Sequence, residues 1–185
     1  MSRSLSQVIR CAVLAGGQRV GAIRDIYFDD GDWTVRHLVV ETGGLLSSRM
    51  VLLSPQRVTD VNLHDHHLVV SLTPAQVAAG INAEERMPVS RIHEVQLHTY
   101  YQWPFYWGHS EAFFEGRSPD RPMISDVLAN EEDRIRESFH SDPPTHLRSL
   151  GELLGYHART DSVSIGRVRD LLMGDSDWHI DSIVI

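Results

Sequence analysis

Short stretches of Val, Ile and Leu, separated by Gly, Asp and other turn-forming residues, run along the chain as far as Leu72. This pattern predicts β-strands joined by tight turns. The expected strands are Cys11–Leu14, Val20–Phe28, Trp33–Glu41, Met50–Leu53, Val58–Val61 and Leu68–Leu72. Several closely spaced strands of this length indicate a mainly β fold, either a small barrel or a sandwich.

Two local signals fix where these strands begin and end. Asp29–Asp32 joins two long strands as a hairpin turn, in which Gly31 supplies a positive φ. Thr73 caps a short helix that starts at Pro74, because a proline suits the first helical position, and Gly80 ends that helix.

The chain contains an internal repeat. Residues 3–40 align without a gap with residues 148–185, with 10 identities in 38 positions and an offset of 145. The recurring pairs include Gly21 and Gly166, Asp25 and Asp170, and Trp33 and Trp178, together with an Arg-Ser-Leu segment at Arg3 and at Arg148. The second copy stops at the equivalent of Val40, so the strands that follow Val40 have no counterpart in it.

The composition of the sequence changes between the two copies. From about Gly108 the chain is rich in acidic residues and proline and sparse in apolar residues, which is typical of a linker. One short helix is expected within it, with Asn130 as cap and Ile135 and Phe139 on one face. We therefore divide the chain into a complete barrel with an aromatic strap (1–107), an acidic linker (108–146) and a partial second barrel (147–185).

Composition removes several classes of function. All 17 basic residues are arginine, so lysine chemistry and a GxxxxGK[ST] phosphate loop are excluded. The net charge of −8 disfavours nucleic-acid binding, which depends on cationic contacts. No stretch has the roughly 20 apolar residues of a membrane-spanning helix. Cys11 is the only cysteine, which excludes an intramolecular disulfide and fits a reducing, cytoplasmic location.

Five segments together resemble a known family. They are VGAIRDIYFDDGDWTVRHLVVETGG, VLLSP, LVVSLTPAQV, PVSRIHE and YYQWPFYWG. They are similar to the PRC-barrel family, named for the cytoplasmic domain of the photosynthetic reaction-centre H subunit. The resemblance covers roughly Leu5 to Gly108 and, as half a barrel, Leu147 to Ile185. The last two segments resemble a bacterial subgroup of the family.

The resemblance implies a compact six-stranded barrel that binds or assembles with protein partners. It implies no catalytic residues and no cofactor. The reaction-centre subunit has an N-terminal membrane helix that this sequence lacks, so the protein is not identified with that subunit. The ribosome maturation factor carries a related barrel, and this gives an alternative role in ribosome assembly.

Two clusters suggest metal binding, but neither has the required pattern. His64, His66 and His67 lie in a predicted hairpin loop with no distant partner ligands at a known spacing. The acidic turn at Asp29–Asp32 lacks the spacing and the distant Glu of a calcium loop. We expect a solvated loop and a turn, and no bound metal; a metal-dependent hydrolase that uses the histidine loop is the remaining enzymatic alternative.

Two further groups carry residues that often serve function. Ser90, His93 and Glu94 have the types of a hydrolytic triad, but no nucleophile elbow surrounds the serine, so a structural role is expected. The segment Tyr100–Trp107 is rich in aromatic residues, among them Tyr101, Trp103, Tyr106 and Trp107. This strap either packs on the barrel or forms a protein-contact surface.

Residues that recur in both copies are candidates for roles in the fold. Asp25 and Asp170 are expected to accept backbone N–H bonds at a strand crossing, and the functional alternative is a shared ligand site. Trp33 is expected to be buried at the start of a strand, and the same applies to its counterpart Trp178. Gly21 and Gly166 complete the set of recurring structural candidates.

The sequence thus predicts a non-catalytic interaction or assembly module whose protein partner is not identified. The last strand, 178–185, is apolar and has no successor to pair with. Three arrangements are open: it pairs with another chain, it docks on the first barrel, or the chain is part of a longer protein. We favour the last, and expect the 185-residue chain to self-associate through this edge.

Overall fold

The structure is a computed structural model, and it describes residues 2–44, 47–80, 146–161, 163–174 and 177–185. The predicted aromatic strap, the linker helix and the group at Ser90 lie outside the described residues. Residues 147–185 are called the C-terminal repeat below, and residues 2–80 the N-terminal domain. Both belong to the same compact unit.

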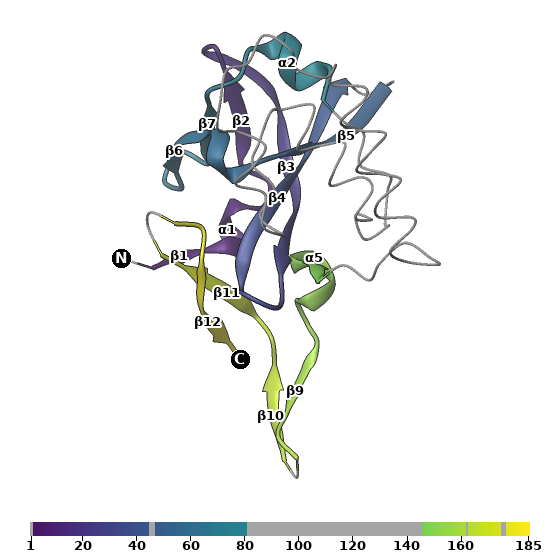
Figure 1. Cartoon of the computed structure of the whole chain (residues 1–185), viewed down its shortest axis with the longest axis vertical. Helices are drawn as coiled ribbons and strands as arrows, with labels where there is room; N and C mark the ends of the chain where they lie inside the picture. Colours follow the sequence, from purple (N-terminus) through teal and green to yellow (C-terminus); the bar gives the residue numbers. More distant parts are fainter. Residues whose placement is uncertain (1, 45–46, 81–145, 162, 175–176) are drawn as a thin grey trace, which may run out of the picture. The chain divides into compact units, whose positions relative to one another are not determined.

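All six strands predicted for the N-terminal domain are present, and the mainly β fold with short helices is confirmed. They are β2 (Ala12–Ala15), β3 (Gln18–Asp29), β4 (Thr34–Gly44), β5 (Ser47–Leu53), β6 (Val58–Asn62) and β7 (His67–Val70). They form one curved sheet in the order β5-β4-β3-β2-β7-β6 (Figure 1). Only β2 and β7 run parallel; the other neighbours in this path are antiparallel.

The core of this sheet follows from alternating side chains. On β2 and β7 every second residue is buried, as expected when successive side chains point to opposite faces. The buried apolar residues from these and the neighbouring strands include Val13, Ala15, Ile23, Ile26, Leu38, Val40, Val51, Leu53, Leu68 and Val70. Their burial against one another holds the curved sheet together.

Short capped helices connect the strands. Helix α2 (Pro74–Ala78) has a capping box between Thr73 and Gln76, as the sequence indicates. A 3₁₀ turn, η1 (Pro55–Arg57), joins β5 to β6. Helices α1 (Leu5–Val8) and α5 (Leu150–Leu153) hold equivalent places in the two repeats, and each is capped by a serine hydroxyl.

The C-terminal repeat has the local structure of the N-terminal copy. Its strands are β8 (Leu147–Ser149), β9 (His157–Arg159), β10 (Ser164–Arg167), β11 (Asp170–Met173) and β12 (Ile180–Val184). Every paired position of β11 with β12 equals a paired position of β3 with β4 shifted by 145, including the bulge before Met173. The β9–β10 hairpin repeats the register of β2 with β3 in the same way.

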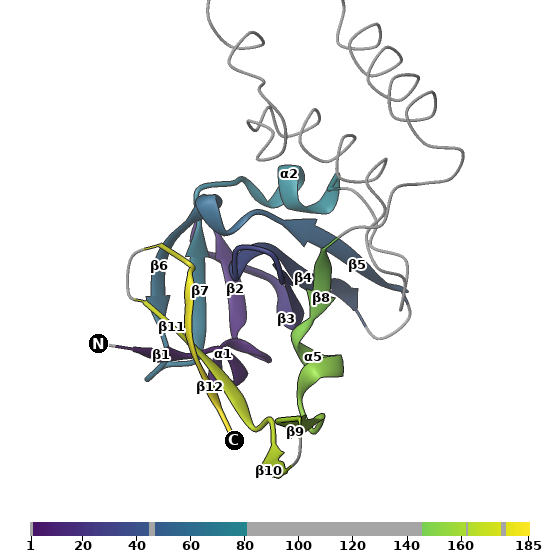
Figure 2. The same ribbon diagram turned by 60° about the horizontal axis from the view of Figure 1, so that its bottom comes forward.

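The two repeats exchange their first strands. Strand β1 (Arg3–Ser4) leaves the N-terminal copy and pairs with β11, whereas β8 leaves the C-terminal copy and pairs with β3 (Figures 1 and 2). The registers are equivalent, because Ser4 lies opposite Leu172 and Ser149 lies opposite Tyr27. The C-terminal repeat is therefore docked on the N-terminal domain, which is the arrangement that the sequence analysis did not favour.

Trp33 and Trp178 lie where the two repeats meet. The Val35 N–H donates to the Trp178 carbonyl at 2.9 Å, and the Ile180 N–H donates to the Trp33 carbonyl at 2.8 Å. Between these bonds Thr34 forms an isolated antiparallel bridge with its own repeat equivalent, His179. These reciprocal contacts are those of a local two-fold relation between the repeats.

The expectation that Trp33 is a buried residue within a strand is wrong in detail. Strand β4 begins at Thr34, and Trp33 is a half-buried turn residue with a φ of 56°. The prediction that Gly31 supplies the positive φ of this turn is wrong, because Trp33 has it and Gly31 does not. Its ring stacks on Phe28 with a centroid separation of 5.6 Å. Trp178 has the same left-handed backbone, with a φ of 55°. The turn geometry, which local apolar patterns do not encode, starts the strand one residue later than predicted.

This geometry makes two substitutions at Trp33 distinguishable. Trp33→Ala loses the ring contact and keeps a strained φ, and we expect it to lower the unfolding free energy by about 2–3 kcal/mol. Trp33→Gly loses the same ring but adopts the left-handed conformation freely, so it should be more stable than the alanine variant by about 0.5–1 kcal/mol. Urea denaturation of both variants measures the difference, and a glycine variant less stable than alanine would contradict this account.

Candidate interaction surface

A carboxylate on β3 holds the exchanged segment of the C-terminal repeat. Asp25 Oδ1 accepts the backbone N–H of Ile26 at 2.8 Å and of Gly151 at 3.0 Å. The Ser149 hydroxyl donates to Asp25 Oδ2 at 2.5 Å. The same hydroxyl accepts the Glu152 N–H at 3.0 Å and so caps α5. One side chain therefore fixes both the strand β8 and the helix that follows it.

Asp170, in the C-terminal repeat, makes the equivalent contacts with the first segment of the N-terminal domain. Its Oδ1 accepts the N–H of Leu171 at 2.8 Å and of Ser6 at 3.0 Å. Its Oδ2 accepts the Ser4 hydroxyl at 2.5 Å and the Ser6 hydroxyl at 2.9 Å. Hydrogen bonds to an ionised acceptor are stronger than neutral ones, so the two aspartates are well suited to hold the repeats together.

The serine partners were missed by the sequence analysis, although their signal was present. Ser4 and Ser149 lie in the recurring Arg-Ser-Leu segment, at the same distance from the recurring aspartate. A polar residue that recurs together with a recurring acid is a candidate for a hydrogen-bonded pair. The sequence cannot show which copy supplies each partner, because both choices have the same local pattern.

The two recurring glycines allow a close approach within each repeat. A Cβ placed on Gly21 would lie 2.9 Å from Val40 Cγ1 and would overlap the Glu41 carbonyl oxygen. A Cβ on Gly166 would lie 2.5 Å from Cγ2 of Ile185, the repeat equivalent of Val40. Both distances are too short for any side chain, so these positions are restricted to glycine by packing.

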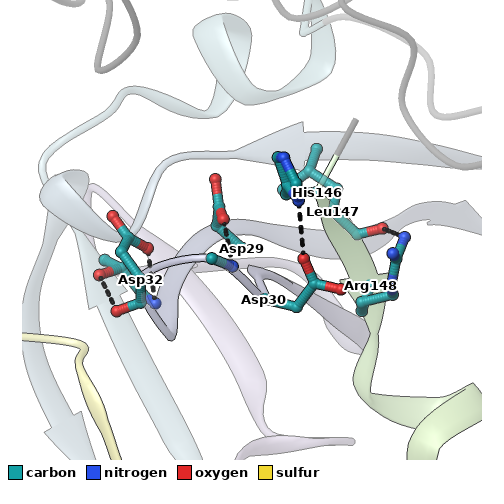
Figure 3. Close-up of polar contacts among 8 residues, drawn as sticks. Asp29, Asp30, Asp32, His146, Leu147 and Arg148 are labelled. Atoms are coloured by element: carbon teal, nitrogen blue, oxygen red, sulfur yellow. Dashed lines mark hydrogen bonds and ion pairs between the residues drawn. The ribbon is translucent and has the colours of Figure 1, made fainter. Parts of the chain in front are cut away.

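The acidic turn is occupied by contacts within the protein (Figure 3). Asp30 bonds His146 Nδ1 at 3.0 Å and pairs with Arg148 Nε at 2.8 Å. Asp29 Oδ1 accepts the Gly31 N–H at 2.8 Å. Asp32 accepts the Thr34 N–H at 3.1 Å and, as an ion pair, contacts Arg36. These acids stabilise the turn and join it to the start of the C-terminal repeat.

The histidine loop lies in the turn between β6 and β7, where Asp65 bonds Asn62 through both its N–H and its carboxylate. His66 has a φ of 52° in this turn. Within the described ranges no three His, Cys, Asp or Glu side chains converge as metal ligands would. The geometry of this loop is that of a tight turn held by Asn62.

An open groove of about 480 Å³ lies beside β3. It is lined by Arg10, Arg19, Val20, Gly21, Ala22, Arg24, Glu41 and Gly43. Glu41 forms an ion pair with Arg24, which offsets part of the positive charge. The remaining arginines give this side of an otherwise acidic chain a local cationic character.

Exposed apolar side chains gather on the C-terminal repeat. Among the described residues, the large apolar side chains that are exposed are Tyr156, Val163, Ile165, Ile183 and Ile185. Ile183 is 43% and Ile185 45% exposed, whereas their equivalents Leu38 and Val40 are both 0% exposed. Tyr156 is 59% exposed, and its equivalent Cys11 is 1% exposed. We call Ile183 and Ile185, which are two residues apart at the end of the last strand, the uncovered face.

The backbone of β12 continues the uncovered face. In the described residues β12 is the outer strand of the sheet β1-β11-β12, whereas its equivalent β4 pairs with β5 on the corresponding side. An outer strand presents N–H and C=O groups that another strand can pair with. The start of this edge contacts the N-terminal domain through Ile180 and His179, so the part of the edge beside the uncovered face is the part that follows Ile180.

A comparison with protein families identifies the family that the N-terminal domain matches. The model of the PRC-barrel domain matches residues 2–77. This part of the chain is a PRC-barrel domain. The match to the PRC-barrel family includes β1, α1 and all six strands of the N-terminal sheet and ends within α2. No second PRC-barrel match is found in the C-terminal repeat.

No curated protein matches the chain in sequence. In the described part of the chain, no helix is long and apolar enough to cross a membrane. The family match therefore covers residues 2–77. The C-terminal repeat and its contacts lie outside that match.

Removing the carboxylate of Asp25 or Asp170 should weaken the contact between the two repeats. Asp25→Asn replaces an acceptor oxygen with an amide NH₂ that faces donors, and we expect a loss of about 2–4 kcal/mol in unfolding free energy. Asp170→Asn should cost a similar amount, whereas Asp181→Asn, at an exposed position, should change it by less than about 0.5 kcal/mol. Chemical denaturation checks this; an Asp25→Asn variant as stable as the parent would show that the carboxylate is dispensable.

Tyr27 makes the join sensitive to alkaline pH. The pKa of the Tyr27 phenol is raised to about 12. Burial is the largest cause, and the nearby negative charges of Asp25 and Glu152 add to it. An unfolded tyrosine ionises near a pKa of about 10, so its contribution to stability is present below pH 10 and is lost as the pH rises toward 12. Tyr27→Phe should reduce the loss of stability in this window. Thermal melts of both proteins at several alkaline pH values test this, and equal losses would contradict it.

Proposed function

We propose that this protein is a non-catalytic interaction or assembly module in which the C-terminal repeat acts as a partial second PRC-type barrel. Its binding surface is the uncovered face together with the outer edge of β12. The observation that carries the proposal is the contrast between repeats, because side chains buried in the N-terminal domain are exposed at equivalent positions in the C-terminal repeat.

The contrast supports binding for an energetic reason. Fully burying one large apolar side chain stabilises a complex by about 1.5–3 kcal/mol. The face has two such side chains, and the exchanged strands and aspartates hold it on the PRC-barrel domain. A partner therefore meets a surface whose backbone is already ordered, which lowers the entropy that binding must overcome.

The proposed role within a larger process rests on the family. A PRC-barrel domain supports a part in the assembly of a reaction-centre-like or other membrane complex, and the related barrel of the ribosome maturation factor gives ribosome assembly as the alternative. In the described residues no contact favours the ribosomal role, and no cluster of ligands favours a metal-dependent hydrolase. Binding is thus the function that the described geometry supports best.

Site-specific photo-cross-linking in cells that naturally express the protein tests the proposal. A photoreactive amino acid is placed at Ile183 and, as the control, at Ile165. Ile165 is also exposed, but its equivalent Val20 is not part of the buried core, so it lies outside the uncovered face. We expect one defined cross-linked protein from position 183 and none of it from position 165.

The captured protein must then bind directly. It is identified by mass spectrometry, purified, and titrated against the chain and its Ile183→Asp variant. The proposal predicts at least a tenfold weaker affinity for the variant, equivalent to about 1.4 kcal/mol. Equal capture from positions 183 and 165, or equal affinity for both chains, would contradict a binding role for this face.

A further inference from the structure

We propose that the groove beside β3 binds an acidic peptide segment of a partner protein, whose carboxylates pair with Arg10 and Arg19. This site lies on the PRC-barrel domain and goes beyond the proposed function, because it does not depend on the uncovered face. The observation that carries it is a difference between the repeats. The C-terminal repeat has the equivalent backbone geometry at both positions but neither arginine.

Arg10 occupies a backbone position that favours glycine. Its φ is 74°, in the left-handed region where any side chain costs free energy. The equivalent residue is Gly155, with a φ of 92°. The Arg10 N–H donates to the Ile23 carbonyl at 2.8 Å, and the Gly155 N–H donates to the equivalent Val168 carbonyl at the same 2.8 Å. Glycine therefore suffices for the backbone, which points to a role for the Arg10 side chain.

Two bulges in β3 accompany the other arginines of the groove. Arg19 and Arg24 are five positions apart and would face opposite sides of a regular strand. The pairing of β3 skips Val20 against β2 and Arg24 against β4, and such bulges re-aim side chains, so that both arginines line the groove. The C-terminal repeat keeps the first bulge, at Ile165, but has Ser164 in place of Arg19. The bulge thus belongs to the fold, whereas the arginine beside it does not.

Two guanidinium groups of the groove are available to a ligand. Arg24 is paired with Glu41, whereas the exposed side chains of Arg10 and Arg19 form no hydrogen bond or ion pair with the residues that the structure describes. The three arginines and the glutamate leave a net charge of +2 in the lining. A guanidinium group binds a carboxylate through two parallel hydrogen bonds, so two carboxylates match both the charge and the number of available groups.

The lining of the groove favours a peptide over a nucleic acid. Ala22 and Gly43 line it with little side-chain bulk, which lets another backbone approach closely. A nucleic acid brings a row of phosphates, which the carboxylate of Glu41 and the net charge of −8 would repel. Separate carboxylates on an extended peptide reach the two arginines without adding a phosphate at every step.

An NMR titration of the 185-residue chain tests the site. The probe is an acetylated and amidated peptide of alternating glutamate and glycine, added at about pH 6, where its carboxylates are ionised. We expect saturable shifts of the side-chain Nε–H signals of Arg10 and Arg19 that weaken as salt is added. The signal of Arg159, an exposed arginine of β9 outside the groove, should not move.

Variants that copy the C-terminal repeat separate binding from stability. Arg10→Gly and Arg19→Ser should each weaken the peptide affinity by about fivefold, the effect of losing one well-formed contact with an ionised group at an exposed site. Arg159→Ser is the control and should leave the affinity unchanged. Arg10→Gly should melt at least as high as the parent, because glycine adopts the left-handed conformation freely. A lower melting temperature with unchanged affinity would assign Arg10 a structural role and overturn the proposal.

Three other outcomes would also overturn it. They are an absence of saturable shifts at Arg10 and Arg19, equal binding of a peptide with glutamine in place of glutamate, and displacement of the peptide by a lower concentration of single-stranded oligothymidylate. The last outcome would identify a nucleic acid as the occupant of the groove. Cross-linking at Ile183 involves none of these arginines, so the binding role of the uncovered face stands or falls separately.

Discussion

The structure depends on two aspartates that each hold the first strand of the other repeat. Asp25 accepts donors from Ser149 and Gly151, and Asp170 accepts donors from Ser4 and Ser6. A carboxylate whose two oxygens both accept hydrogen bonds in this way fixes the geometry of the segments that donate to it. Through these contacts the C-terminal repeat is joined to the N-terminal domain.

This arrangement explains how half a barrel can be ordered and yet have an exposed apolar face. The core-facing residues Leu150, Leu171 and Met173 are buried, and the exchanged strands satisfy the backbone around them. Among the described residues, no strand pairs with β12 on the side where β5 pairs with β4. The N-terminal domain thus gives the C-terminal repeat its stability, and the exposed Ile183 and Ile185 form the face that we propose as the binding surface.

The sequence predicted the local structure well, because local structure follows local pattern. Apolar stretches and turn residues located the six strands, and Thr73 and Pro74 located α2. The gapless repeat has its structural counterpart in the equivalent registers of β3–β4 and β11–β12. The exchange of β1 and β8 could not be predicted in this way. Pairing within one repeat and pairing between repeats use the same residues, so only their arrangement in space distinguishes them.

The candidate surface was predicted only in part. The edge strand at the end of the chain was visible as an apolar segment without a successor, whereas the exposure of Tyr156 required the structure, since an aromatic residue near a strand is usually buried. Trp33 was correctly chosen as a structural residue of the repeat but placed in a strand. Its left-handed backbone lies at the contact between the two turns, where the Trp33 carbonyl accepts the Ile180 N–H.

Native-state hydrogen exchange tests the central claim, that the two repeats form one cooperative unit joined by reciprocal contacts. The most informative amides are those of Ser6 and Gly151, which donate to the aspartate of the opposite repeat. The account predicts that both amides exchange with the same free energy of opening, close to that of buried Ile26 in β3. Opening of Ser6, Gly151 and Leu171 at a much lower free energy, with Ile26 still protected, would show that the C-terminal repeat unfolds independently and would contradict the claim.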